Sequence, residues 1–559
     1  MLTRLGPFLA IGLLTVPVAF GLAGTLLPAF GYLPALGGME FGLAPFAMLF
    51  SEPAIFMSAL MSLVSGLATA AISLAVVMLF TAAWGGTRLF ARIQHLISPL
   101  LSVPHAASAF ALAFLIAPSG MIARLISPGL TGWERPPDLL IVHDPFGLSM
   151  MAGLIVKEIP FLLLVTLAAL PQVKPARMRA LIASMGYGRI SGFVFGLWPS
   201  IYPQIRLPVF AVIAFATSVV DVAAILGPTT PAPLAVRLVD WMNDPDLSMR
   251  FLASAGAVLQ LGVTAAAILI WIGFEKLGAR LRDQFSCAGR RFRRDSVLRW
   301  GALAAMLVSA GAIFAGLVAL GLWSVAGLWQ YPDLLPARFD LRNWMRVLPN
   351  LVEPLATTLF VAFISTFVAA VIAILCFVRE DEMGRPPGRG ALALLYLPLL
   401  VPQVAFLFGL QLLFILTGVE ATLAALVFAH LVFVLPYAWL ALKDPWRAFD
   451  RRYDQIAAGL GKGPVRRFFQ IRLPMLARPL LAVAAIGFSV SVGLYLPTVL
   501  IGAGRLTTIT TEAVALASGG NRRVIGIYAF MQMVLPAAGF AVATIVPALI
   551  FRRYRDMHV

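Results

Sequence analysis

Three ionisable residues, Lys157, Glu158 and Asp221, lie within long apolar stretches of the sequence. A charge at the middle of a bilayer costs about 3 kcal/mol on insertion scales, so each of them needs a partner or water. One interpretation is that they line a pathway and contact a polar solute. The other is a structural network in which Lys157 pairs with Asp221 or with Glu158 between helices. The sequence alone does not decide between the two.

Motifs for nucleotide binding, catalysis or metal binding do not emerge from the sequence. A P-loop requires G-x4-G-K-[ST], and the nearest string, Gly461-Lys462-Gly463, lacks the first glycine and the hydroxyl. His105 and His430 lie in apolar stretches without metal-type partners nearby, so we predict that both are packed histidines. Cys287 and Cys376 have no ligand-like neighbours either. We therefore expect no enzyme activity, no cofactor and no metal in this chain.

The composition is that of a membrane protein. The 559 residues are 60% hydrophobic and 12% charged, whereas soluble proteins carry roughly 25% charged residues. This composition excludes soluble, disordered, collagen-like and disulfide-rich chains. A membrane span needs about 20 apolar residues, and twelve stretches meet that length. We therefore predict an all-α polytopic protein with spans at 7–29, 54–82, 99–119, 148–171, 205–227, 250–274, 300–323, 352–378, 391–417, 421–442, 479–502 and 524–551.

The distribution of charge predicts the orientation of these spans. Twelve spans place both termini on one side, which holds 31 of the 42 Lys and Arg residues, whereas the opposite side holds 10. Positive charge is retained in the cytoplasm, so we expect both termini there and the chain in a bacterial inner membrane. Most of the net charge of +17 then contacts anionic lipid headgroups, and no nucleic acid is expected. The first span follows Arg4, but its apolar run is too long for a signal peptide.

Two loops carry the same pattern at an offset of 275 residues. Each has apolar residues at i, i+3, i+4 and i+7, which predicts a short helix with one apolar face. A glycine follows each helix where a C-cap glycine belongs, and a proline lies thirteen residues after each glycine. The residues are Met178, Leu181, Ile182, Met185, Gly186 and Pro199 in the first loop, and Tyr453, Ile456, Ala457, Leu460, Gly461 and Pro474 in the second.

This duplication predicts two halves of six spans each. The first repeat would cover 1–274 with its loop at 172–204, and the second would cover 300–559 with its loop at 443–478. A basic cytoplasmic linker, 275–299, would join them. Because six is even, both halves enter the membrane from the same side. A single amphipathic helix could lie in the headgroups, but two at matched positions favour a paired docking surface.

The two loops resemble the EAA loop of ATP-binding-cassette (ABC) importer permeases, E-A-A-x3-G-x9-I-x-L-P. The second copy, 455–474, keeps the Gly, Ile, Leu and Pro of this pattern, and the first, 180–199, keeps the Gly and Pro. Both copies lack the opening Glu, since Ala180 and Gln455 stand there. Over nearly its whole length the chain is similar to fused two-repeat type I permeases of the iron(III), thiamine and polyamine group. The stretches 219–228 and 495–505 resemble its YnjC-like branch.

The resemblance implies a mechanism and a set of partners. Each short helix would be a coupling helix seated on an ATPase subunit, so two copies imply two ATPase subunits, which would bind ATP and Mg²⁺. A periplasmic solute-binding protein would deliver a small polar solute. Asp221 and Glu158 suit an organic cation such as thiamine, with ferric ion, a polyamine or an oxyanion as alternatives. A secondary transporter of the major-facilitator type is the alternative class, because duplicated six-span halves suit it too.

Overall fold

The computed structural model describes residues 2–386 and 388–550. These residues form helices joined by turns, with two isolated β-bridges as their β-type pairings. The first half contains α1 (Leu2–Ala29), α2 (Ala44–Ser51), α3 (Ile55–Trp84), α4 (Arg88–Ile97), α5 (His105–Ile116), α6 (Met121–Ile126), α7 (Leu148–Ala169), α8 (Pro175–Ser184), α9 (Arg189–Gly192), α10 (Trp198–Thr217), α11 (Asp221–Leu226), α12 (Leu234–Met242) and α13 (Met249–Cys287).

The second half contains α14 (Ser296–Ser324), α15 (Arg342–Met383), α16 (Arg389–Leu400), α17 (Gln403–Thr417), α18 (Leu423–Ala448), α19 (Arg452–Gly459), α20 (Pro464–Arg467), α21 (Leu473–Met475), α22 (Ala477–Gly493), α23 (Leu496–Gly502), α24 (Ile509–Ala515) and α25 (Arg522–Ile550). Short 3-10 turns are η1 (Pro34–Leu36), η2 (Ser98–Ser102), η3 (Leu170–Val173) and η6 (Leu516–Ser518), and π-turns are η4 (Phe193–Leu197) and η5 (Phe468–Arg472).

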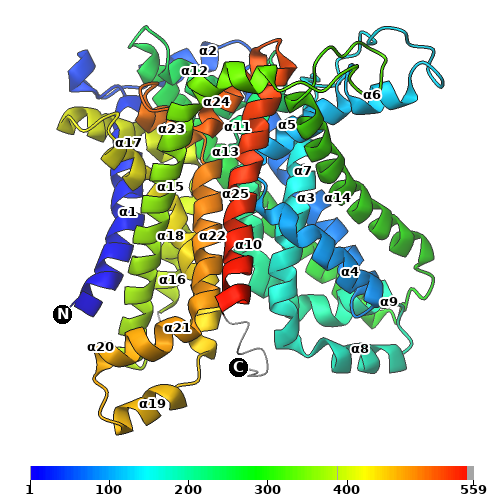
Figure 1. Cartoon of the computed structure of the whole chain (residues 1–559), viewed down its shortest axis with the longest axis vertical. Helices are drawn as coiled ribbons and strands as arrows, with labels where there is room; N and C mark the ends of the chain where they lie inside the picture. The colour runs from blue at the N-terminus through cyan, green and yellow to red at the C-terminus, as the bar shows by residue number, and fades with distance from the viewer. Residues whose placement is uncertain (1, 387, 551–559) are drawn as a thin grey trace.

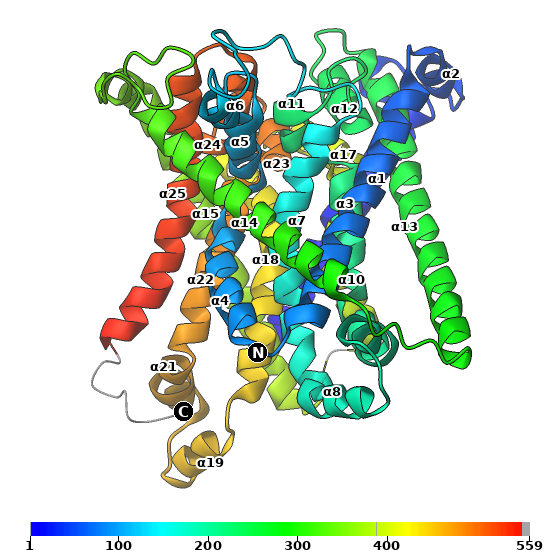
Figure 2. The same cartoon turned by 90° about the vertical axis from the view of Figure 1, so that its right-hand side faces the viewer.

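The long helices run side by side between two ends of the molecule (Figures 1 and 2). Within the described residues, ten helices are long and apolar enough to cross a membrane, or twelve if each of two bent pairs is one span. The predicted all-α, polytopic class is therefore confirmed. Residue 551, the end of the last expected span, and the rest of the second repeat after it lie outside the described residues.

Three expected spans are not continuous helices. The stretch 391–417 forms α16 and α17, which are bent by 89° at a break that contains Pro402. A proline has no N–H to donate, so the helix ends there. The stretches 205–227 and 479–502 are each divided before a short helix, α11 and α23. At the first division the Ser218 hydroxyl binds the Ala214 carbonyl and competes with the helical hydrogen bond.

The first helix of each half packs mainly against the other half. α1 lies along α17 and α15, while α14 crosses α5, α3 and α7 (Figure 2). Glycines make the approach close, since a Cβ on Gly409 of α17 would lie 2.0 Å from the Gly21 carbonyl oxygen of α1. The Gly409 N–H also donates to the Thr25 hydroxyl at 3.1 Å. Small residues replace hydrophobic attraction as the basis of helix contact in lipid, where the solvent is itself apolar.

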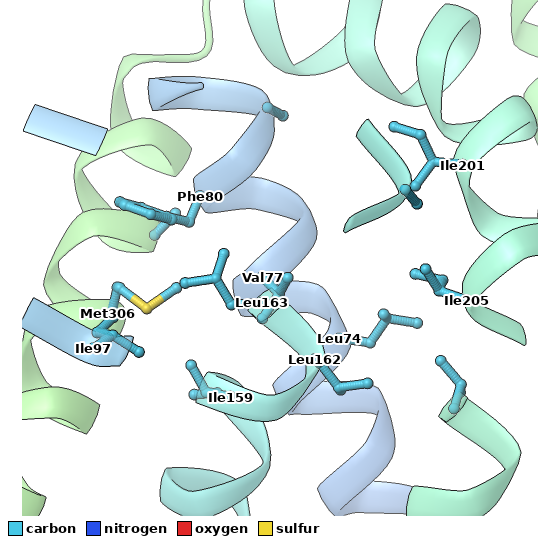
Figure 3. Packing of buried hydrophobic residues seen from close by; sticks show 14 of the residues in the cluster. Leu74, Val77, Phe80, Ile97, Ile159, Leu162, Leu163, Ile201, Ile205 and Met306 are labelled. Carbon is cyan, nitrogen blue, oxygen red and sulfur yellow. The ribbon is translucent and has the colours of Figure 1, made fainter. Parts of the chain in front are cut away.

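A buried apolar core fixes α7 against its neighbours. Figure 3 shows Phe80 of α3, Leu163 of α7 and Met306 of α14 gathered between these helices. All three side chains are nearly or fully buried. The core therefore holds α7 in place and, with it, the adjacent residues Lys157 and Glu158.

Several elements recur at the offset of 275 residues. α7 and α18 begin at Leu148 and Leu423, the π-turns begin at Phe193 and Phe468, and α11 and α23 begin 275 residues apart. These equal offsets support two repeats, although the division itself stays a prediction. The expected linker 275–299 is helical in its first part, because α13 continues to Cys287.

We predict that Gly409→Leu destabilises the protein by about 1–3 kcal/mol, because the new side chain must push α1 away from α17. Thermal unfolding in detergent measures the effect. Gly12→Leu is the matched control on α1, since no atom lies within 4 Å of a Cβ there. Equal transition temperatures for the two variants would contradict the close contact.

Candidate functional site

A cavity of about 250 Å³ lies between the two halves. Its wall comes from the start of α5, the middle of α7, the end of α10, the start of α11, the α16–α17 junction, α18, α22 and α23. The three charged residues singled out in the sequence, Lys157, Glu158 and Asp221, all lie on this wall. The remaining polar lining is His105, Ser218, Gln403, Tyr437, Ser489 and Tyr495.

The wall is built from matched positions that carry unlike side chains. Glu158 and Asp221 correspond, at the offset of 275, to Phe433 and Leu496, which line the same cavity. The first half thus contributes the ionisable groups, and the second half contributes apolar groups and two phenols. The cavity is chemically asymmetric although the backbone around it repeats.

Lys157 does not form either of the ion pairs that the structural interpretation expected. Its buried ammonium donates to the carbonyl oxygens of Leu100 and Leu101, at 3.1 and 3.2 Å. These carbonyls lie in η2, near its C-terminal end, where backbone carbonyls lack helical partners and carry partial negative charge. Lys157 therefore joins η2 to α7.

Glu158 is paired with a histidine instead. The Nε2 atom of His105 lies 3.1 Å from Glu158 Oε1, with side-chain exposures of 33% and 5%. The His105 ring also packs on Phe215, with centroids 4.5 Å apart. The prediction of a packed histidine is thus wrong for His105, which begins α5 beside the cavity. It is confirmed for His430, which is buried and bonded to Ser491 and Thr498 at 2.8 and 2.9 Å.

Asp221 lies at the first position of α11 and is 7% exposed. Within the described residues its carboxylate has no side chain at hydrogen-bonding or ion-pairing distance, and it faces the backbone amides of Asp221 and Val222. The sequence placed this residue inside a span, but it follows the break at 218–220. A buried carboxylate without a counter-ion gains most from a cation that enters the cavity.

This arrangement is suited to binding a small cation rather than to catalysis. Two carboxylates lie on one wall, while Phe433, Tyr437 and Tyr495 offer aromatic faces that attract cations. The volume is slightly below the range of roughly 300–1,000 Å³ typical of ligand pockets. In the part of the chain that the structure describes, no three His, Cys, Asp or Glu side chains are grouped as metal ligands.

The second candidate site is the pair of loops with short helices, α8 and α19, at one end of the bundle (Figure 1). Each helix is followed by a glycine in the left-handed conformation, with φ of +81° at Gly186 and +76° at Gly461. The predicted helices and C-cap glycines are therefore confirmed. Pro199 and Pro474 each occupy the first turn of the helix after the π-turn.

The apolar face of each short helix is only partly covered by the protein. Ile182 packs over Gly196, and Met178 also contacts the core. Ala457 is buried. The other face residues are exposed, by 57% at Leu181, 51% at Met185, 43% at Tyr453, 62% at Ile456 and 75% at Leu460. Large apolar side chains exposed at matched positions mark a surface for a protein partner or for a membrane.

The chain is similar over nearly its whole length to a known inner-membrane protein. It is 30% identical over 503 residues to the inner membrane ABC transporter permease protein YnjC of Escherichia coli, and the alignment covers 89% of each chain. The chain belongs to the ABC transporter permeases. It is a multi-pass protein of the inner membrane, as its apolar helices also indicate. This likeness decides against the major-facilitator alternative.

A shorter part of the permease is similar to a second group of relatives. It is 22% identical over 195 residues to PhnV of Salmonella paratyphi A and Salmonella typhimurium, covering 34% of the permease and 74% of PhnV. PhnV carries the name of a 2-aminoethylphosphonate transport system permease. No family model matches the permease.

Sequence reasoning missed four polar residues of the cavity wall. His105 and Gln403 follow Pro104 and Pro402, the prolines that precede α5 and α17, so this shared X-Pro pattern was an available signal. Tyr437 and Tyr495 had no such signal, because isolated tyrosines are common in spans. Only the packing of the helices brings them to the cavity.

We predict that Lys157→Met lowers the unfolding free energy by about 1–3 kcal/mol, because two buried carbonyls lose their donor. Asp221→Asn removes no side-chain partner and should leave the thermal transition in detergent unchanged or raise it. An equal loss of stability in both variants would assign Asp221 a structural role.

Proposed function

We propose that the permease forms the solute pathway of an ABC importer and couples to two ATPase subunits through α8 and α19. The observation that carries this proposal is the pair of exposed apolar helices at matched positions on one end of the bundle. Both belong to loops that resemble the EAA loop. The ATPase subunits, not this chain, would bind ATP and Mg²⁺.

In this proposal the end with α8 and α19 faces the cytoplasm, as do both termini. This orientation follows from the excess of Lys and Arg on that side. The exposed face residues, such as Ile456 and Leu460, would insert into a groove on each ATPase subunit. Burying them there removes apolar surface from water, which contributes about 25 cal/mol per Å². Headgroup contact is the competing use of the same surface.

Transport would proceed by relative motion of the two halves around the cavity. ATP binding would draw the ATPase subunits together and α8 and α19 with them, opening the cavity to the opposite end. A periplasmic solute-binding protein would deliver the solute at that end, and hydrolysis would reset the permease. A mid-membrane site between duplicated halves is consistent with such rocking.

The solute that suits the cavity is a small organic cation, thiamine-like in having a cationic group on an aromatic body. Asp221 and the Glu158–His105 pair favour positive charge, and Tyr437 and Tyr495 favour an apolar or aromatic body. A polyamine or ferric ion would use the carboxylates but not the aromatic wall. An oxyanion would be repelled by Asp221.

We predict that Gly461→Glu uncouples ATP hydrolysis from transport, because it places a charge on the open turn that follows α19. The complex is purified from native membranes through a tag on the chain, and mass spectrometry should find two ABC ATPase subunits per chain. In proteoliposomes the variant should hydrolyse ATP without solute uptake.

The control for Gly461→Glu is Gly418→Glu. Gly418 has a similar positive φ of +69° and an equally open environment, and it follows α17 at the other end of the bundle (Figure 1). It carries the same strain and charge away from the proposed coupling surface. Unchanged uptake with Gly461→Glu, or a chain purified without an ATPase whose uptake survives ATP depletion, would contradict the proposal.

We predict that Asp221→Asn reduces uptake of the preferred cation by more than about tenfold, since a buried charge pair contributes roughly 2–5 kcal/mol when one partner is removed. Labelled thiamine, spermidine, ferric ion, molybdate and 2-aminoethylphosphonate are compared in proteoliposomes with the ATPase and the binding protein. Asp221→Glu, which keeps the charge, should retain uptake. Transport of molybdate that is unaffected by Asp221→Asn would contradict a cation pathway.

A further inference from the structure

The turn that follows α8 is covered by the segment that joins the two halves. This joining segment, residues 288–295, lies between α13 and α14. The Arg291 carbonyl oxygen accepts hydrogen bonds from the Gly188 N–H at 3.2 Å and from the Ser191 hydroxyl at 2.9 Å. The joining segment is therefore bonded to the first EAA-like loop along its backbone.

Side chains of the joining segment extend this contact. Arg293 Nε donates to the Gly186 carbonyl at 3.1 Å, and Asp295 Oδ2 accepts from the Ile190 N–H at 3.1 Å. The Phe292 ring stacks on Phe195 of the loop, with centroids 6.3 Å apart. Hydrogen bonds on both sides of an aromatic contact hold the segment at one place on the loop.

The matched turn of the second loop has no such cover. A Cβ on Gly186 would lie 3.0 Å from Arg293 and 3.2 Å from Arg291, whereas nothing lies within 4 Å at the equivalent Gly461. The same holds one step later, since a Cβ on Gly188 would meet the Phe292 carbonyl and the equivalent Gly463 is open. A chain of two halves has one joining segment, so the two loops differ by construction of the chain.

The two loops also differ in how their positive charges are balanced. Near α19, Arg451 pairs with Asp381 and Arg452 with Asp450, each at 2.6 Å. In the joining segment the exposed arginines form no ion pair with any residue that the structure describes; they are Arg290, Arg291, Arg293 and Arg294. Burial and the nearby Arg189 lower the pKa of Arg179 on α8, as expected where positive charges gather.

We infer that the joining segment is part of the first coupling surface and that the ATPase subunit seated there meets it with an acidic rim. This inference rests on the proposed function. The opening Glu of the EAA pattern is replaced by Ala180, so the charge presented at this surface is positive. Four unbalanced arginines beside exposed Leu181 and Met185 attract carboxylates around an apolar contact. The second surface offers an open turn and paired charges.

The test counts ATPase subunits bound to the full chain as salt is raised. The chain is placed in nanodiscs of pure phosphatidylcholine, which lack anionic lipid, and mixed without nucleotide with the ATPase that co-purifies with it. Mass photometry should show two subunits on the wild type at low salt. One should leave first as NaCl rises, because the Debye length falls from about 30 Å at 0.01 M to about 3 Å at 1 M.

Arg291→Glu/Arg294→Glu should weaken binding of that one subunit at least tenfold at low salt. Neither side chain donates a hydrogen bond to the loop within the described residues, so the backbone contacts of the segment are kept. Arg92→Glu/Arg385→Glu makes the same change of charge at exposed positions on the same end of the bundle and should bind both subunits as the wild type does.

Two results would overturn the inference while leaving the proposed function intact. One is that both double variants keep two subunits with the salt dependence of the wild type, or lose them equally. The other is that Arg291→Glu/Arg294→Glu changes only the binding of the chain to phosphatidylglycerol, which would make lipid the partner of the segment. A wild-type chain that binds no ATPase under any condition would instead overturn the proposed function itself.

Discussion

Inside a bilayer every backbone N–H and C=O group needs a hydrogen-bond partner, and this constraint links the fold of the permease to its cavity. Continuous helices satisfy it, but a break exposes polar groups unless protein or water covers them. The breaks at 103–104, 218–220, 401–402 and 494–495 all border the cavity. The helices are therefore interrupted where interruption is tolerated, and the same interruptions bring His105 and Asp221 to the wall.

Close packing of small residues joins the halves around that cavity. Gly21 and Gly409 bring α1 against α17, and Gly316 brings α14 against Ala111 of α5. Each half thus lends its first helix to the other. The apolar core around α7 supplies the rigid side of the cavity, since Ile159 and Leu163 are buried there while Glu158 faces the opening. Contacts of this kind depend on shape rather than on hydrophobic attraction.

Duplication of the backbone has not preserved the side chains that carry charge. Asp221 and Leu496 occupy one matched pair of positions at the cavity, and Gly186 and Gly461 occupy another at the loops, with different surroundings in each case. The fold requires only that such positions have the right size and backbone angles. Charge is then free to differ between the halves, which suits a solute and partners that lack two-fold symmetry.

Local patterns in the sequence determined the apolar spans, the short helices and their glycine caps, because composition, period and positive φ are properties of neighbouring residues. The sequence also placed Lys157, Glu158 and Asp221 in the membrane. Tertiary structure alone decided that Lys157 binds the η2 carbonyls, that Glu158 binds His105, and that the joining segment covers Gly186. These contacts join residues 50 or more positions apart, and they form only because helix packing brings the separate segments together.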